Sequence, residues 1–158
     1  MKKLIVINGT MGVGKSTIAK VVAEQLEPSV LLDGDWCWQM HPWHFSAENK
    51  RMVLNNIVYL LNAFLANSSF QYIIFCWVLP DLAILAQIRS RLRSAYMLQQ
   101  VTLICSEAAL QAHFKRRSDD FAAAYARMDG YRRMATPKLD VSQLTPEQAA
   151  RRLLQIVS

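Results

Sequence analysis

The residues best suited to chemistry form a short glycine-rich segment near the N-terminus. Residues 9–16 read GTMGVGKS and match the pattern G-x-x-x-x-G-K-[ST] at every fixed position. In such a loop the glycines let successive backbone N–H groups turn around phosphate oxygens without Cβ clashes. The lysine reaches the β- and γ-phosphates, and the serine hydroxyl is a magnesium ligand. We therefore expect ATP and Mg²⁺ to bind here. The residues expected to contact them are Gly9, Thr10, Met11, Gly12, Val13, Gly14, Lys15, Ser16 and Thr17.

A second candidate is the segment Asp33-Gly34-Asp35, which follows a short apolar stretch. Two carboxylates at the C-terminal end of a strand would lie in the crevice where α/β sheets bind ligands. Asp33, closer to the strand and to Ser16, is expected to act as a magnesium ligand. Asp35 is expected to orient or deprotonate an acceptor hydroxyl. The alternative is a plain turn, because this tripeptide is common in turns.

These residues need a scaffold, and the apolar pattern predicts one. Residues 3–8 form an unbroken Ile- and Val-rich run, typical of a strand buried on both faces of a parallel sheet. Further strands are expected at 30–32, 72–78, 100–105 and 138–141, and helices at 16–26, 48–66, 81–95, 107–117 and 119–134. A last helix is expected after Thr145, where Thr145, Pro146 and Gln148 form a helix-capping signal. This alternation predicts an α/β protein with a parallel sheet of about five strands, in one domain over residues 1–158.

Composition narrows the class of protein. The chain has 158 residues, 53% of them apolar and 19% charged, which is ordinary for a compact globular protein. No apolar run approaches the roughly 18 residues of a membrane span. Lys2 and Lys3 precede an apolar run, but the run is too short for a signal peptide and leads into the glycine loop. Three cysteines without CxxC spacing indicate reduced thiols, so a cytoplasmic location is expected.

The net charge of +6 lies in the second part of the chain, where residues 89–158 hold twelve basic and six acidic side chains. A nucleic-acid partner is one interpretation of such a basic half. We do not favour it, because the basic residues accompany neither an aromatic platform nor a known binding motif. Phosphate-binding arginines and a solvated helix face explain the same charges.

Together the segments GKST, LDGDWCW and YIIFCWV resemble the small P-loop kinases of the nucleotide-kinase, shikimate-kinase and gluconate-kinase group. The closest resemblance is to bacterial ATP-binding proteins described as nucleotide kinases, whose substrate is unassigned. This resemblance implies a P-loop NTPase fold, a three-layer α/β/α sandwich with a five-stranded parallel sheet. It also implies an acceptor-binding region after the second strand and a mobile helical lid with arginines, at about 116–134.

The resemblance assigns further residues. In these kinases a helix after the fourth strand carries R-L-x-x-R; here Arg116 matches the second arginine and His113 replaces the first. An imidazole can also stack on adenine. Asp140 lies in a segment that resembles the loop at the adenine edge. Arg116 and Arg127, with Arg132 next, are expected to neutralise charge on the transferred phosphoryl group.

One position departs from the family pattern. The third strand of these kinases usually ends with a Walker B aspartate, but here the strand reads Phe75-Cys76-Trp77. Asp81 lies beyond Pro80 and is better explained as a helix cap. Asp33 is therefore the carboxylate left for magnesium. The departure also motivates an alternative function, an ATP-binding sequestration or resistance protein with little or no kinase activity.

Between the aspartates and residue 50, three of the four tryptophans fall within eight residues, at Trp36, Trp38 and Trp43. They either pack a loop onto the sheet or line a pocket for a flat or apolar acceptor. His41 and His44 lack companion ligands at metal-site spacing.

The favoured function is that of an ATP-dependent kinase acting on a small-molecule acceptor such as a nucleoside, nucleotide, sugar acid or antibiotic. A nucleic-acid end kinase is a third interpretation. The sequence predicts no membrane partner and leaves monomer and homodimer open.

Overall fold

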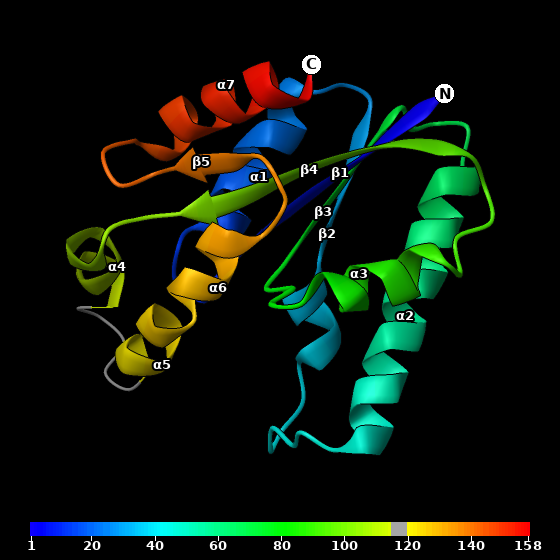
Figure 1. The fold of residues 1–158 in the computed structure, drawn as a ribbon. Helices are drawn as coiled ribbons and strands as arrows, with labels where there is room; N and C mark the ends of the chain where they lie inside the picture. The colour runs from blue at the N-terminus through cyan, green and yellow to red at the C-terminus, as the bar shows by residue number, and fades with distance from the viewer. Residues whose placement is uncertain (115–119) are drawn as a thin grey trace.

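The structure, a computed structural model, describes residues 1–114 and 120–158. Five parallel strands form one sheet in the order β2-β3-β1-β4-β5 (Figure 1). The strands are β1 (Lys2–Gly9), β2 (Ser29–Asp33), β3 (Tyr72–Trp77), β4 (Tyr96–Ile104) and β5 (Lys138–Asp140). This arrangement confirms the predicted α/β class and the five-stranded parallel sheet.

Helices cover both faces of the sheet (Figure 1). The helices are α1 (Lys15–Gln25), α2 (Ala47–Ala66), α3 (Leu82–Arg89), α4 (Glu107–Phe114), α5 (Phe121–Ala126), α6 (Met128–Arg133) and α7 (Pro146–Val157), with a 3-10 helix, η1 (Gly34–Trp38). Helices α2 and α3 pack on one face, and α1 and α7 on the other together with buried residues of α4, α5 and α6.

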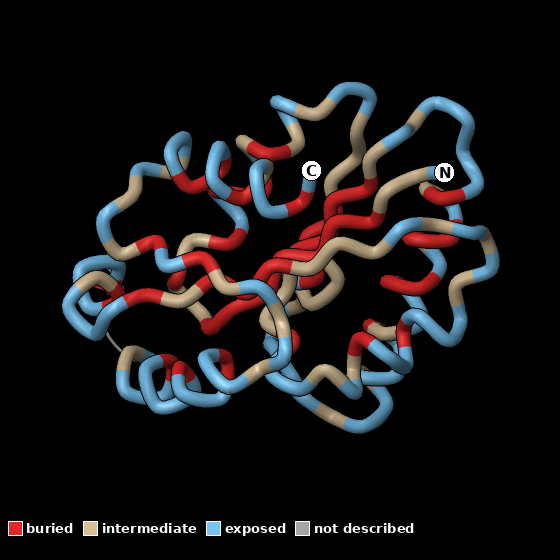
Figure 2. The backbone as a smooth tube through the Cα atoms, turned by 45° about the horizontal axis from the view of Figure 1, so that its top comes forward, coloured by how far each residue is buried: buried red, intermediate tan, exposed pale blue. Residues whose placement is uncertain are grey.

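The central strand β1 explains this layering. Its side chains alternate, so that Leu4 and Val6 pack under α2 and α3 while Ile5 and Ile7 pack under α1 and α7. All four are at most 1% exposed. Figure 2 shows the strands as the buried centre of the molecule and the loops at their ends as its exposed rim. Because the strands are parallel, their C-terminal ends and the loops after them meet at one edge.

Two predicted capping signals are confirmed. Thr145 and Gln148 form a reciprocal capping box at the start of α7, with Pro146 in its first turn. The Asp81 carboxylate accepts a hydrogen bond from the backbone N–H of Ala83 at 2.9 Å and so caps α3, as the sequence indicated. Among the described residues, no helix combines the length and apolarity that a membrane crossing requires.

Some predicted boundaries were wrong. The helix expected at 81–95 ends at Arg89, because the Asn62 side chain of α2 binds the Arg91 carbonyl and the Arg93 N–H and so holds the following backbone in a turn. Strand β4 starts at Tyr96 rather than at residue 100. The arginine-rich stretch expected as one helix forms two short helices, α5 and α6, within its described part.

Candidate nucleotide-binding site

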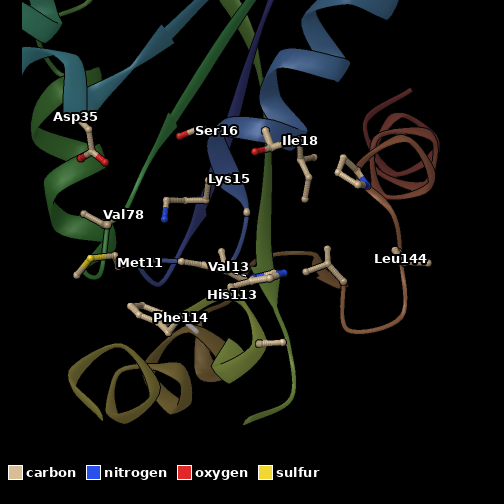
Figure 3. Close-up of a pocket in the computed structure, with 16 residues that line it drawn as sticks. Met11, Val13, Lys15, Ser16, Ile18, Asp35, Val78, His113, Phe114 and Leu144 are labelled. Atoms are coloured by element: carbon tan, nitrogen blue, oxygen red, sulfur yellow. Dashed lines mark hydrogen bonds between the residues drawn. The ribbon is translucent and has the colours of Figure 1, made fainter. Parts of the chain in front are cut away.

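A cavity of about 600 Å³ opens at the carboxyl edge of the sheet (Figure 3). One wall is the glycine-rich loop with the first turn of α1, together with Asp35 and Val78. The rest of the lining comes from α4, which adjoins the loop, and from the segment that leads into α7. The complete lining is Met11, Gly12, Val13, Gly14, Lys15, Ser16, Thr17, Ile18, Asp35, Val78, Ala112, His113, Phe114, Val141, Leu144 and Pro146. Seven of the nine residues of segment 9–17 that are expected to contact the nucleotide therefore line one cavity.

The loop takes its shape from two glycines with left-handed backbones. Gly12 has φ +82° and Gly14 has φ +108°, values that other residues rarely adopt. Gly12 also lies against the Phe114 ring, where an added Cβ would come within 2.3 Å of a ring carbon. Only glycine fits there, so the loop can approach α4 closely.

The two remaining loop residues, Gly9 and Thr10, do not line the cavity. Gly9 ends β1 so close to β4 that a Cβ there would lie 2.9 Å from the Leu103 carbonyl oxygen. The buried Thr10 hydroxyl donates to the Ala124 carbonyl of α5 at 2.7 Å. The Thr10 side chain therefore ties the loop to a helix and is not part of the cavity lining.

Lys15 is the first residue of α1 and is 8% exposed. Its ammonium donates to the Thr10 carbonyl at 2.9 Å. Burial lowers the pKa of Lys15 to about 8, while Asp35, Cys76 and Asp33 partly oppose this shift. An anionic ligand in the cavity would favour the charged ammonium, as expected of a phosphate-binding lysine.

Ser16 and Asp33, the two expected magnesium ligands, lie in direct contact. The Ser16 Oγ donates to Asp33 Oδ2 at 2.5 Å, and the other carboxylate oxygen accepts the backbone N–H of Asp35 at 2.9 Å. A hydroxyl and a carboxylate are hard oxygen donors of the kind that Mg²⁺ prefers, and Mg²⁺ usually adds only one or two carboxylates to waters and phosphate oxygens. The pair therefore fits magnesium. In the part of the chain that the structure describes, His, Cys, Asp and Glu form no cluster of three or more that could hold a metal.

Asp35 also reaches the cavity. Burial and the neighbouring Asp33 raise the pKa of this carboxyl, and Lys15 and a hydrogen bond from the Trp77 side chain oppose the rise. Between the two aspartates, Gly34 packs on Trp77, where an added Cβ would lie 2.3 Å from a ring carbon. Sequence reasoning missed the contribution of Trp77. The glycine between two aspartates, beside a strand that ends in tryptophan, was the available signal.

Outside the loop, one residue that was predicted near the nucleotide lines the cavity and another does not. His113 of α4 lines the cavity, and its Nδ1 lies 2.7 Å from the Gly12 carbonyl oxygen. Asp140 is exposed and bonds with Ser142 outside this cavity, whereas the adjacent Val141 lines it.

Of the arginines expected in the lid, the two that the structure describes, Arg127 and Arg132, do not line the cavity. Arg127 is exposed at the junction of α5 and α6. Arg132 donates to the Cys105 carbonyl at 2.8 Å, which gives it a structural role. Arg116 lies outside the described residues.

The tryptophan-rich segment forms an aromatic cluster of Trp38, Trp43 and Phe45. Ring centroids lie 5.6 Å apart for Trp38 with either partner and 6.0 Å apart for Trp43 and Phe45. Trp43 is 59% and Phe45 is 60% exposed. The Trp43 and Phe45 rings are therefore not buried against the sheet, although Trp38 packs partly against the core.

The five-stranded parallel sheet and the glycine-rich loop define a P-loop nucleotide-binding fold. Residues 5–127 match the model of an AAA domain family, and the chain belongs to this family. No curated protein sequence matches it.

Solved structures share the fold at low identity. A tunicamycin resistance protein from Deinococcus radiodurans is 20% identical, covers 98% of this chain and 95% of its own, and has a TM-score of 0.73. A gluconokinase from Sinorhizobium meliloti is 18% identical over 98% of this chain and 91% of its own, with a TM-score of 0.72. A Mycobacterium tuberculosis APS kinase, solved with AMPPNP and APS, is 18% identical over 98% of this chain and 96% of its own, with a TM-score of 0.68.

Proposed function

We propose that this protein transfers the γ-phosphoryl group of ATP to a small-molecule acceptor. The observation that carries the proposal is the convergence of Lys15, Ser16 and Asp35 on one cavity, with Asp33 hydrogen-bonded to Ser16. Because phosphoryl transfer needs little covalent chemistry from the protein, positioned charges of this kind supply most of what the reaction requires.

Each group has a distinct task. The backbone N–H groups of the loop and the Lys15 ammonium hold the phosphates. Ser16 and Asp33 would hold magnesium, which neutralises charge on the β- and γ-phosphates when it is bound. Asp35 would accept a hydrogen bond from the acceptor hydroxyl, and its raised pKa makes it a better proton acceptor than an ordinary aspartate.

The aromatic cluster supports a flat acceptor, such as a nucleoside, a nucleotide or another heterocyclic compound. Trp38 belongs to the same 3-10 helix, η1, as Asp35, so the exposed rings belong to the same short structural unit as the candidate base. Aromatic rings bind flat ligands by stacking, and this cluster leaves large ring areas exposed. The reaction is expected in the cytoplasm, where ATP is abundant and thiols stay reduced.

A second candidate is binding and sequestration of a ligand without phosphorylation. The end of the third strand supports it, because the resemblance leads us to expect an aspartate there and the strand reads Phe75-Cys76-Trp77. The name of the D. radiodurans neighbour, a tunicamycin resistance protein, is compatible with an antibiotic as ligand.

Incubation with labelled Mg-ATP and fractions of a metabolite extract separates the two candidates. A kinase releases ADP, and labels an acceptor, only with particular fractions. If a fraction raises ATP affinity but no fraction yields ADP or labelled product, sequestration is the better description. A salt-sensitive gel shift with oligonucleotide ends would instead support the nucleic-acid kinase.

A further inference from the structure

The turn after β3 has an unusual backbone conformation beside the nucleotide cavity. Leu79 has φ +37°, and in the described part of the chain it is the only residue other than glycine with a positive φ. A bulky side chain rarely adopts such a backbone, and the proline that follows it, Pro80, favours a negative φ at this position. We propose that Tyr131 and Asn8 are positioning residues that hold this turn, and with it Val78, in the conformation that receives the nucleotide. The inference rests on the proposed function, because it requires the cavity to bind nucleotide.

Val78 links the turn to the cavity. It directly precedes Leu79 and is part of the cavity lining. In the view of Figure 3, Val78 lies between Asp35 and Met11, and the Lys15 side chain extends toward this wall. The Leu79 side chain is fully buried in the core cluster under α2 and α3. Because this side chain is held in the core, a change of φ at Leu79 would move Val78 relative to the phosphate loop.

Tyr131 of α6 holds the first of two consecutive carbonyl groups in this turn. Its hydroxyl donates to the Val78 carbonyl oxygen at 2.8 Å, across 53 residues of sequence. The Tyr131 ring is buried, and a buried tyrosine needs a partner for its hydroxyl. Tyr131 does not itself line the cavity, so it acts on the site through Val78.

Asn8 holds the second carbonyl group. Its Nδ2 donates to the Leu79 carbonyl oxygen at 3.1 Å. The Thr102 hydroxyl of β4 donates to Asn8 Oδ1 at 2.7 Å, which fixes the amide group with its donor side toward the turn. Asn8 and Thr102 are both fully buried, where polar side chains are stable only when they are hydrogen-bonded. Asn8 also directly precedes Gly9, so one residue connects the phosphate loop with the opposite wall.

These two hydrogen bonds offset the cost of the Leu79 backbone. A strained conformation persists only where its surroundings hold it, and here two side chains from different elements bind adjacent carbonyls. If one bond is lost, part of the free protein should relax to a conformation that binds nucleotide poorly. The apparent affinity then falls in proportion to the fraction that remains competent.

Calorimetric titration with Mg-AMPPNP tests the role of Tyr131. Tyr131→Phe removes the hydroxyl and keeps the buried ring, and loss of one hydrogen bond corresponds to a factor of about three to ten. We expect this variant to bind Mg-AMPPNP more weakly by that factor. The matched control is Tyr59→Phe, the same change at an exposed position of α2, which should stay within about twofold of wild type. Wild-type affinity in Tyr131→Phe would overturn the role of Tyr131.

The same titration tests Asn8. Asn8→Ala should also weaken binding about threefold to tenfold, because the Leu79 carbonyl loses its donor. Thr136→Val is the control: the Thr136 hydroxyl bonds with Thr102 at 2.6 Å, one step further from the turn. This variant keeps both bonds to the turn and should bind within about twofold of wild type. Equal losses in the two variants would overturn the role of Asn8. If Asn8→Ala does not fold, Tyr131→Phe decides the inference.

NMR distinguishes positioning of the turn from a general loss of stability. The Val78 methyl signals are identified by their disappearance in Val78→Ala. The wild type should show one set of these signals, and free Tyr131→Phe should show a second set or broadened lines. Saturating Mg-AMPPNP should restore a single set, because the ligand selects the competent conformation. A single, unchanged set in free Tyr131→Phe would overturn the inference.

The wild-type titration separates the two levels of the account. Failure of the wild-type protein to bind Mg-AMPPNP would overturn the proposed function itself. A wild type that binds, with Tyr131→Phe and Asn8→Ala indistinguishable from it, would overturn this inference alone.

Discussion

At the scale of single residues, the two aspartates differ although only Gly34 separates them. Asp33 faces Ser16 and is 6% exposed, whereas Asp35 lines the cavity and has a raised pKa. The charge of Asp33 is therefore available to a metal beside Ser16, and the charge of Asp35 to an acceptor.

This difference predicts two distinct phenotypes. Asp33→Asn should raise the magnesium requirement about tenfold, and excess metal should partly restore kcat, because one charged ligand is lost. Asp35→Asn should lower kcat by about 10²-fold or more at every magnesium concentration while ATP binds normally. The measurement is kcat against magnesium concentration for both variants. Identical curves would mean that the pair acts as one unit, and metal rescue of Asp35→Asn instead would reverse the two roles.

At the scale of elements, the phosphate loop depends on contacts with helices that come much later in the chain. Thr10 binds the Ala124 carbonyl of α5, and Gly12 contacts Phe114 and His113 of α4. The loop and these helices therefore form one packed unit.

Gly12→Ala tests this unit. The new Cβ would meet Phe114 at 2.3 Å, and φ at this position is +82°. We expect a loss of more than about 2 kcal/mol in the free energy of unfolding, together with weaker ATP binding. The matched control is Gly130→Ala in α6, where nothing lies within 4 Å of the new Cβ. The control should be neutral or more stable by up to about 1 kcal/mol. Urea unfolding compares the two, and equal effects would contradict the packing argument.

The helix pair α5 and α6 is the described part of the expected lid. Arg127, at their junction, is exposed and does not line the cavity. If the pair closes over bound nucleotide, Arg127→Ala should lower kcat about tenfold or more with little change in the KM for ATP. Arg133→Ala is a control with the same change in charge. A change in KM alone, or equal effects in the two variants, would place the lid contact elsewhere.

The features of these elements that the sequence predicts are those that depend on residues close together in the chain. The phosphate loop, the Thr145 cap and the strand count follow from patterns within a few residues, and the structure confirms them. The early end of α3 depends on Asn62, which lies 29 residues before the backbone that it binds. The Thr10 contact with Ala124 spans 114 residues. Contacts of this kind appear only when the chain is folded.

At the scale of the whole molecule, the parallel sheet brings the ends of β1, β2 and β3 to one edge, each with its share of the site. Strand β1 leads into the loop, β2 into the aspartates, and β3 ends in Cys76 and Trp77. The site therefore depends on the order of the strands in the sheet, in which β3 lies between β2 and β1. Sequence reasoning found the groups on β1 and β2 because motifs mark them, and missed the contact of Trp77 with Gly34 because that contact depends on the pairing of β2 with β3.

The central claim is that the loop of residues 9–16 binds Mg-ATP through Lys15. Calorimetric titration of Mg-ATP tests it most directly, with Lys15→Ala compared with Lys20→Ala, an exposed lysine of the same helix. Loss of a charge-assisted hydrogen bond is worth about 1.5–3 kcal/mol. The predicted result is that wild type and Lys20→Ala bind equally, and that Lys15→Ala binds at least about tenfold more weakly at an unchanged melting temperature. Undiminished binding by Lys15→Ala, or no binding by the wild type, would contradict the account.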